Sequence, residues 1–132
     1  SLATALKATE EAIFITDING VVQDLNPAFE RLTGYALDEF IGQQTRILRS
    51  GQHDKTFYSQ MWTTILNGDV WQGSFTNKRK DGSVYYVEQT IAPVRDEGGA
   101  ITAFVAAQRD VTKRQKAEDE LRKSEARYRL LF

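Results

Sequence analysis

The sequence predicts an α+β fold in which short helices cover one face of a five-stranded antiparallel sheet. In residues 70–112, apolar and polar residues alternate on both sides of two glycine turns, Asp81-Gly82 and Gly98-Gly99. This pattern indicates three consecutive antiparallel strands. In residues 12–25, a similar alternation surrounds Asn19-Gly20 and predicts a hairpin of two strands.

The chain is expected to begin with a helix. Residues 1–11 are good helix formers, and Leu2 and Leu6 fall on one side of the predicted helix. This segment therefore predicts a short amphipathic helix ahead of the first strand.

Between the two strand regions, the sequence has the signals of several short helices. Asn26-Pro27 is typical of a helix start, with a cap residue followed by proline, and Gly34 is typical of a helix end. Asp54 is expected to cap the longest of them. The further helical segments are expected at 38–41, 45–48 and 54–66.

The composition changes after Thr112. Residues 113–132 are charged helix formers without glycine or proline, and small or apolar residues recur at alternating steps of four and three. The recurring positions are Ala117, Leu121, Ser124, Tyr128 and Leu131. This spacing is the seam of a two-stranded coiled coil, so we expect a homodimer that forms through this helix, through the N-terminal helix, or through both. The predicted division is therefore 1–11, 12–112 and 113–132.

Strand parity places three amides among apolar neighbours. Successive strand residues point to opposite faces, so Asn77 shares a face with Trp71 and Phe75. The apolar faces of the next two strands include Gln89 and Gln108. A buried amide without a partner costs roughly 1–3 kcal/mol, so these three should bond to each other, to water or to a bound molecule.

Composition excludes several kinds of function. The chain has 17 basic and 18 acidic side chains, which argues against a nucleic-acid surface. It has no cysteine, and its one histidine, His53, cannot form a multi-histidine metal site. With no recognisable nucleophile, metal set or phosphate loop, we expect no enzyme. No apolar run reaches the ~20 residues that cross a bilayer, so we expect no membrane insertion and a cytoplasmic location.

Three stretches resemble bacterial PAS and PAC sensor modules. They are NPAFERLTGY at 26–35, FIG at 40–42 and WQGSFTNKRKDGSVYYVEQTIAPVRDEGGAITAFVAAQRDVTKR at 71–114. The resemblance implies the PAS fold, with 12–112 as the PAS/PAC sensor domain and 113–132 as a signalling-helix linker. SEARYRLLF, at 124–132, resembles the lead-in to a next PAS domain. The implied partners are covalently attached output domains of histidine kinases in two-component systems, diguanylate cyclases, phosphodiesterases or chemoreceptors.

Part of the chain is also similar to flavin-binding PAS groups. Light-oxygen-voltage domains carry an N-C-R-F-L-Q motif, two strand asparagines and a glutamine on the last strand. The corresponding positions here are 44–49, Asn77, Val87 and Gln108, so Thr45 replaces the reactive cysteine. The spacing of Ser50, Tyr58 and Trp62, followed by a W-x-G step, is more similar to the redox PAS domains of nitrogen-fixation and aerotaxis regulators, which use FAD without a cysteine adduct.

This resemblance implies FAD or FMN as a candidate cofactor. The implied cofactor-binding residues are Asn77, Gln108, Trp71, Thr45, Arg46 and Gln89. Side-chain amides can match the alternating donor and acceptor edge of a flavin, and Arg46 and Arg49 could bind a phosphate. The alternative is an amide network that packs with water in an empty or differently liganded pocket. Haem is disfavoured because His53 lies in a polar loop, where a solvated or capping role is expected.

The function that these patterns favour is a non-enzymatic sensory module. A change in the pocket would alter the hydrogen bonds of Gln108 and Asn77, and the last strand would pass it to the C-terminal helix. The residues expected to couple the two are Gln108, Asp110 and Thr112, because 110–112 resembles the D-I-T junction of PAS domains. The alternative is a ligand-free dimerisation and spacer module.

Overall fold

The sheet has the five antiparallel strands that the sequence predicts. The computed structural model describes residues 4–5 and 9–131, so Leu2 and Leu6 of the expected N-terminal helix lie outside the described residues. Within them, the strands are β1 (Ala12–Asp17), β2 (Val22–Leu25), β3 (Trp71–Lys78), β4 (Val84–Arg95) and β5 (Ile101–Asp110). They form one antiparallel sheet in the order β2-β1-β5-β4-β3, which confirms the predicted α+β class and leaves β3 at an edge.

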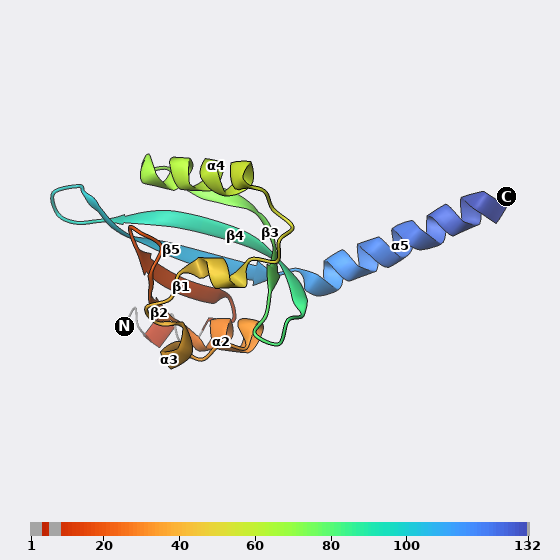
Figure 1. Ribbon diagram of the computed structural model, residues 1–132, viewed down its shortest axis with the longest axis horizontal. Helices are drawn as coiled ribbons and strands as arrows, with labels where there is room; N and C mark the ends of the chain where they lie inside the picture. Colours follow the sequence, from red (N-terminus) through yellow and green to blue (C-terminus); the bar gives the residue numbers. More distant parts are fainter. Residues whose placement is uncertain (1–3, 6–8, 132) are drawn as a thin grey trace.

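The helical segments connect the two halves of the sheet and follow its last strand. They are α2 (Pro27–Thr33), α3 (Leu37–Phe40), the 3-10 helix η1 (Thr45–Leu48), α4 (Lys55–Leu66) and α5 (Thr112–Leu131). Figure 1 shows α5 leaving the end of β5 and extending away from the rest of the domain. Asn26 and Asp54 cap α2 and α4, as predicted from the sequence.

The core lies between the inner face of the sheet and the helices. The buried strand residues alternate along each strand, which confirms the parity argument. The cluster joins strand residues Phe14, Phe75, Tyr85, Val87, Ile91 and Phe104 to helical residues Phe29, Phe40, Leu48, Met61 and Ile65. Trp71 packs against this cluster but remains half-buried.

Asn26 ties the first helix to the first strand. Its Oδ1 accepts hydrogen bonds from the backbone N–H groups of Phe29, at 3.0 Å, and Ile13, at 2.9 Å. Its Nδ2 donates to the backbone carbonyl of Glu11 at 2.9 Å. The side chain is only 4% exposed, so its removal would leave buried backbone groups without partners.

We therefore expect Asn26→Ala to lower the free energy of unfolding by about 2–3 kcal/mol, because it removes a helix cap and two bonds to the β1 end of the chain. Asp54→Ala is the matched control, since it removes an exposed cap that accepts from the Phe57 N–H at 2.9 Å, and it should cost about 1 kcal/mol. Urea unfolding of both variants measures the difference. Equal losses would contradict the cross-linking role of Asn26.

Candidate functional site

A cavity lies between the inner face of the sheet and the η1–α4 segment. Its polar lining includes Asn77, Gln89 and Gln108 from the strands, and Thr45, Arg49 and Tyr58 from the helical side. The rest of the lining is mostly apolar and includes Phe14, Leu48 and Phe104. The cavity offers about 60 Å³ to water-sized molecules, within about 600 Å³ of atom-free space that includes its open mouth.

The structure brings most of the predicted site residues to this cavity. Thr45, Asn77, Gln89 and Gln108 all line it. Trp71 and Arg46 are not among its lining residues. The indole of Trp71 packs against the rings of Phe57 and Phe75, with centroids 5.8 and 5.2 Å away, while Arg46 is exposed on η1.

The floor of the cavity carries a hydrogen-bonded amide pair. Gln89 and Gln108 face each other across β4 and β5, and Gln108 Nε2 donates to Gln89 Oε1 at 2.5 Å. Gln108 Oε1 is also buried and has no hydrogen-bond partner in the described part of the chain. The pair therefore satisfies one of its own acceptors and leaves another for a donor in the cavity.

The helical side of the cavity carries a second polar group that the sequence did not reveal. The Tyr58 hydroxyl is buried without a hydrogen-bond partner among the residues that the structure describes. The Arg49 guanidinium lies 3.7 Å from the centre of the Tyr58 ring. Burial raises the pKa of Tyr58, and the nearby Arg49 charge partly opposes this rise. Tyr58 therefore stays neutral at physiological pH, and its hydroxyl can donate a hydrogen bond to a molecule in the cavity.

The junction between β5 and α5 is held by side chains on both sides. Asp110 Oδ1 accepts from the backbone N–H of Thr112 at 3.0 Å and from its hydroxyl at 2.6 Å. Thr112 Oγ1 in turn accepts from the backbone N–H of Tyr86 on β4 at 3.0 Å. Asp110 thus bonds to the first residue of α5, and the first turn of α5 is fixed to the sheet.

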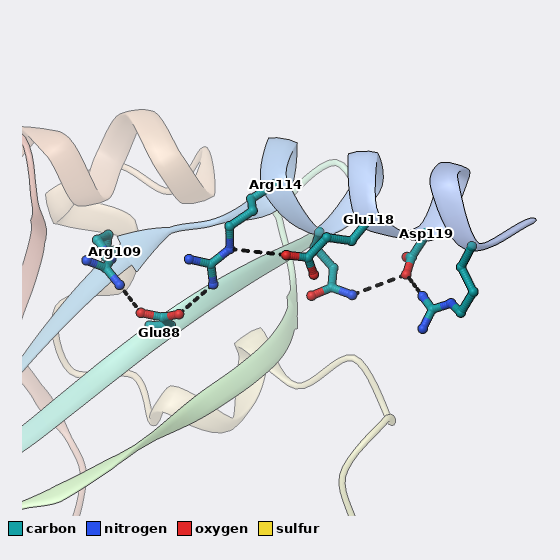
Figure 2. A network of polar contacts seen from close by, with 7 residues as sticks. Glu88, Arg109, Arg114, Glu118 and Asp119 are labelled. Atoms are coloured by element: carbon teal, nitrogen blue, oxygen red, sulfur yellow. Dashed lines mark hydrogen bonds and ion pairs between the residues drawn. The ribbon is translucent and has the colours of Figure 1, made fainter. Parts of the chain in front are cut away.

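An ion cluster on the outer face of the sheet reinforces this junction. Figure 2 shows Glu88 of β4 between Arg109 of β5 and Arg114 of α5, and Arg114 reaches on to Glu118. The Arg114 contact to Glu88 is 2.6 Å long. The hydrogen bonds from Arg114 and Arg109 hold the pKa of Glu88 below its usual value. Sequence analysis missed Glu88, although opposite charges at 88 and 109 are adjacent in the strand register.

The inner amide pair and the outer ion cluster lie back to back. Glu88 and Gln89 are neighbours on β4, and their cross-strand partners, Arg109 and Gln108, are neighbours on β5. Because successive side chains alternate between faces, a displacement of this part of β5 moves both contacts.

Neither a metal cluster nor a membrane-spanning helix is found among the described residues. They contain no cluster of three or more histidine, aspartate or glutamate side chains that could hold a metal ion. Among the helices described there, none is both long enough and apolar enough to cross a membrane.

Comparisons with known proteins agree with this architecture. A protein-family model for the PAS fold matches residues 2–111. The nitrogen fixation regulatory protein of Klebsiella oxytoca is 36% identical over 119 residues, which cover 90% of this chain and 24% of that protein. The aerotaxis receptor of Escherichia coli is 32% identical over 83 residues, 63% of this chain and 16% of the receptor. The chain thus spans a quarter or less of the length of these two relatives.

A solved structure extends the comparison to light-oxygen-voltage domains. One such domain, examined with a flavin analogue, superposes with a TM-score of 0.77 at 26% identity, and the match covers 96% of this chain and 95% of that domain. The resemblances to nitrogen-fixation, aerotaxis and light-oxygen-voltage proteins that the motifs indicated are confirmed.

Proposed function

The chain belongs to the PAS family, and we propose that it is the sensory module of a multidomain signalling protein, in which the state of the inner cavity is passed to α5. The observation that carries the proposal is the position of Gln108. Its amide reaches the cavity floor, while its strand continues within four residues into α5 through Asp110 and Thr112. A change in the hydrogen bonding of one side chain therefore acts on the strand that holds the helix.

Coupling of this kind has a thermodynamic requirement. A ligand shifts the arrangement of α5 only if it binds two arrangements unequally. Gln108 can supply this difference, because its Oε1 can accept a hydrogen bond from one state of a ligand and not from another. Glu88 and Arg114 would hold the helix in one of the two arrangements.

FAD or FMN is the cofactor that we propose for the cavity. The polar floor suits the hydrogen-bonding edge of a flavin ring. Gln108 Oε1 can accept from the ring, and the Asn77 and Gln89 amides line the same cavity. Arg49, at the helical side, carries a charge that a phosphate would attract. A bound flavin would supply redox chemistry whose change of protonation these amides would sense. Thr45 in place of a cysteine excludes a thioether to the ring.

The volume of the cavity sets a condition on this cofactor. Pockets for drug-sized ligands usually measure about 300–1,000 Å³. The 60 Å³ open to water-sized molecules is well below that range, so a flavin requires part of the wall to move outward. The polar groups of the cavity fit a flavin, but its present volume is too small to hold one.

A ligand-free dimerisation and spacer module is the second candidate. The small cavity favours it, because about 60 Å³ is enough for a few water molecules at roughly 10–15 Å³ each. Waters could satisfy Gln108 Oε1 and the Tyr58 hydroxyl without any ligand.

In either case we propose a homodimer formed through α5. Leu121, Tyr128 and Leu131 lie on the predicted seam and are 60%, 64% and 77% exposed. A second copy of the helix would cover these side chains in the spacing of a coiled coil. The N-terminal residues 1–11 are the other proposed contact.

The first test is the absorption spectrum of the purified domain, as isolated and after incubation with FAD and FMN. We expect the twin absorption bands of a bound oxidised flavin, and about tenfold weaker flavin affinity in Asn77→Ala, which removes an amide from the floor. Gln72→Ala is the control, because Gln72 lies on the outer face of the same strand. A colourless protein that takes up neither flavin would overturn the cofactor and favour the spacer module.

Another prediction concerns Gln108→Leu in the complete signalling protein. The substitution keeps the volume of the side chain but removes the donor to Gln89 and the free acceptor, so the output should no longer respond to the signal. A stability loss of about 1–3 kcal/mol is expected from the unpaired Gln89 oxygen. Gln72→Leu on the outer face should leave the response intact. A normally regulated output from the Gln108 variant would contradict the coupling.

A further prediction concerns the dimer. Leu121→Glu places a charge on the seam, and the dimer should dissociate at a protein concentration about tenfold or more higher than the original chain, as measured by analytical ultracentrifugation. Leu130→Glu is the matched control, because Leu130 is 88% exposed and lies off the seam. Unchanged association of the Leu121 variant would show that α5 is not the interface.

A further inference from the structure

One wall of the cavity is a separate segment that lies along the edge of the sheet. Thr45, Leu48 and Arg49 line the cavity from this side. Arg49 also forms an antiparallel bridge to Asn77 of β3. Because β3 is an edge strand, its outer backbone groups need partners from outside the sheet. We refer to residues 45–53 as the wall segment.

Two side chains of the wall segment attach it to a single residue of β3. His53 Nε2 accepts a hydrogen bond from the backbone N–H of Thr76 at 2.9 Å. The Ser50 hydroxyl donates to the backbone carbonyl of Thr76 at 2.5 Å. The wall segment thus satisfies both outer backbone groups of Thr76, as a neighbouring strand would.

His53 is held in this position by aromatic contacts. Its ring stacks on Phe57 with centroids 4.1 Å apart and meets Phe75 edge-on at 5.6 Å. The expectation of a solvated or capping histidine was therefore wrong, because the ring packs between α4 and β3 and bonds to the strand. The loop position gave no sign of these contacts, which arise only when the wall segment meets the sheet.

The bond between His53 and Thr76 depends on the charge of the imidazole. Only a neutral ring can accept at Nε2, and its proton is then on Nδ1. A protonated ring would point an N–H at the N–H of Thr76, so the attachment would be replaced by the contact of two donors. The Ser50 bond does not titrate and would be the bond that remains between the wall segment and Thr76.

The surroundings of His53 favour the neutral ring. Burial lowers the pKa of His53, and the adjacent Asp54 carboxylate partly opposes this effect. The Tyr58 ring also meets the imidazole edge-on at 6.0 Å, and the Arg49 guanidinium lies over the Tyr58 ring. The closed wall therefore holds the neutral imidazole, and a released wall would return His53 to its ordinary pKa.

We propose that His53 is a proton-operated latch that closes the wall segment on β3 and thereby controls access of ligands to the cavity. The latch rests on the proposed function only for the identity of the ligand. The latch matters for that function because the cavity is small. With about 60 Å³ open to water-sized molecules, it must widen before a flavin-sized molecule can bind. Release of the wall segment would widen it on the side of Arg49 and Thr45.

The pH range of the latch follows from linkage. The closed wall lowers the pKa of His53, so the open wall binds more protons at mildly acid pH. As pH falls from the ordinary imidazole value of about 6.5 toward the lowered value, each pH unit favours the open wall by up to about tenfold. Above this range the closed wall is favoured most, and below the lowered value no further change is expected.

The test is an NMR titration of the ligand-free domain. His53 is the only histidine, so its ring signals are unambiguous. We expect the amide proton of Thr76 to titrate with the same midpoint as the ring, because the two share a hydrogen bond. The amides of Leu48 and Arg49 should follow with that midpoint, because they belong to the wall that moves.

Two variants make the titration decisive. Asp54→Asn keeps a good helix cap but removes the charge that raises the pKa of His53, so both midpoints should move together to lower pH. His53→Gln retains an acceptor that does not titrate, so the Thr76 shift should no longer depend on pH.

Independent midpoints for Thr76 and His53, in the original domain or in Asp54→Asn, would overturn the latch. A Thr76 titration that leaves Leu48 and Arg49 unchanged would also overturn it, because the wall would then stay closed. These measurements use no flavin, so a domain that refuses flavin and still titrates as expected would contradict the cofactor and support the latch.

Discussion

The hydrogen bond between Gln89 and Gln108 is the constraint on which the rest of the structure depends. It joins the two longest strands, β4 and β5, in the middle of a mostly apolar inner face. A slip of β5 by one residue would place Arg109 on this face and Gln108 outside, at the large cost of burying a charge. The amide pair therefore helps to fix the strand register and, through it, the point at which α5 begins.

The same register places the Gln89–Gln108 pair on the inner face next to the Glu88–Arg109 pair on the outer face. Exposed ion pairs such as those of Glu88 add little stability, because water and salt screen the charges. Their value here is positional, because Arg114 directs the first turn of α5 toward the strand residue next to Gln89. The Thr112 contacts to Asp110 and Tyr86 fix the start of the helix, and Glu88 fixes the direction in which it leaves.

The sequence predicted those parts of the molecule that depend on local chemistry. Strand alternation and glycine turns gave the sheet, and Asn26 and Asp54 marked helix starts, because caps and turns involve residues close in sequence. Parity also placed Asn77, Gln89 and Gln108 together. Parity put Trp71 on the correct face of the sheet but could not show that its indole packs against Phe57 and does not line the cavity. Arg46, Tyr58 and His53 depended on where η1 and α4 meet the sheet, which no local pattern specifies.

Two buried polar groups of the cavity have no hydrogen-bond partner among the residues that the structure describes. Gln108 Oε1 belongs to the sheet, and the Tyr58 hydroxyl belongs to α4 beside the wall segment. A buried polar group left without a partner costs about 1–3 kcal/mol, so both groups favour a molecule in the cavity, water or ligand, that bonds to them. Because the groups lie on opposite sides of one cavity, a molecule that pairs with both would connect the floor to the helical side. The binding energy of such a molecule would then depend on the position of the wall segment. Its bond to Gln108 would also act on β5 and, through β5, on α5.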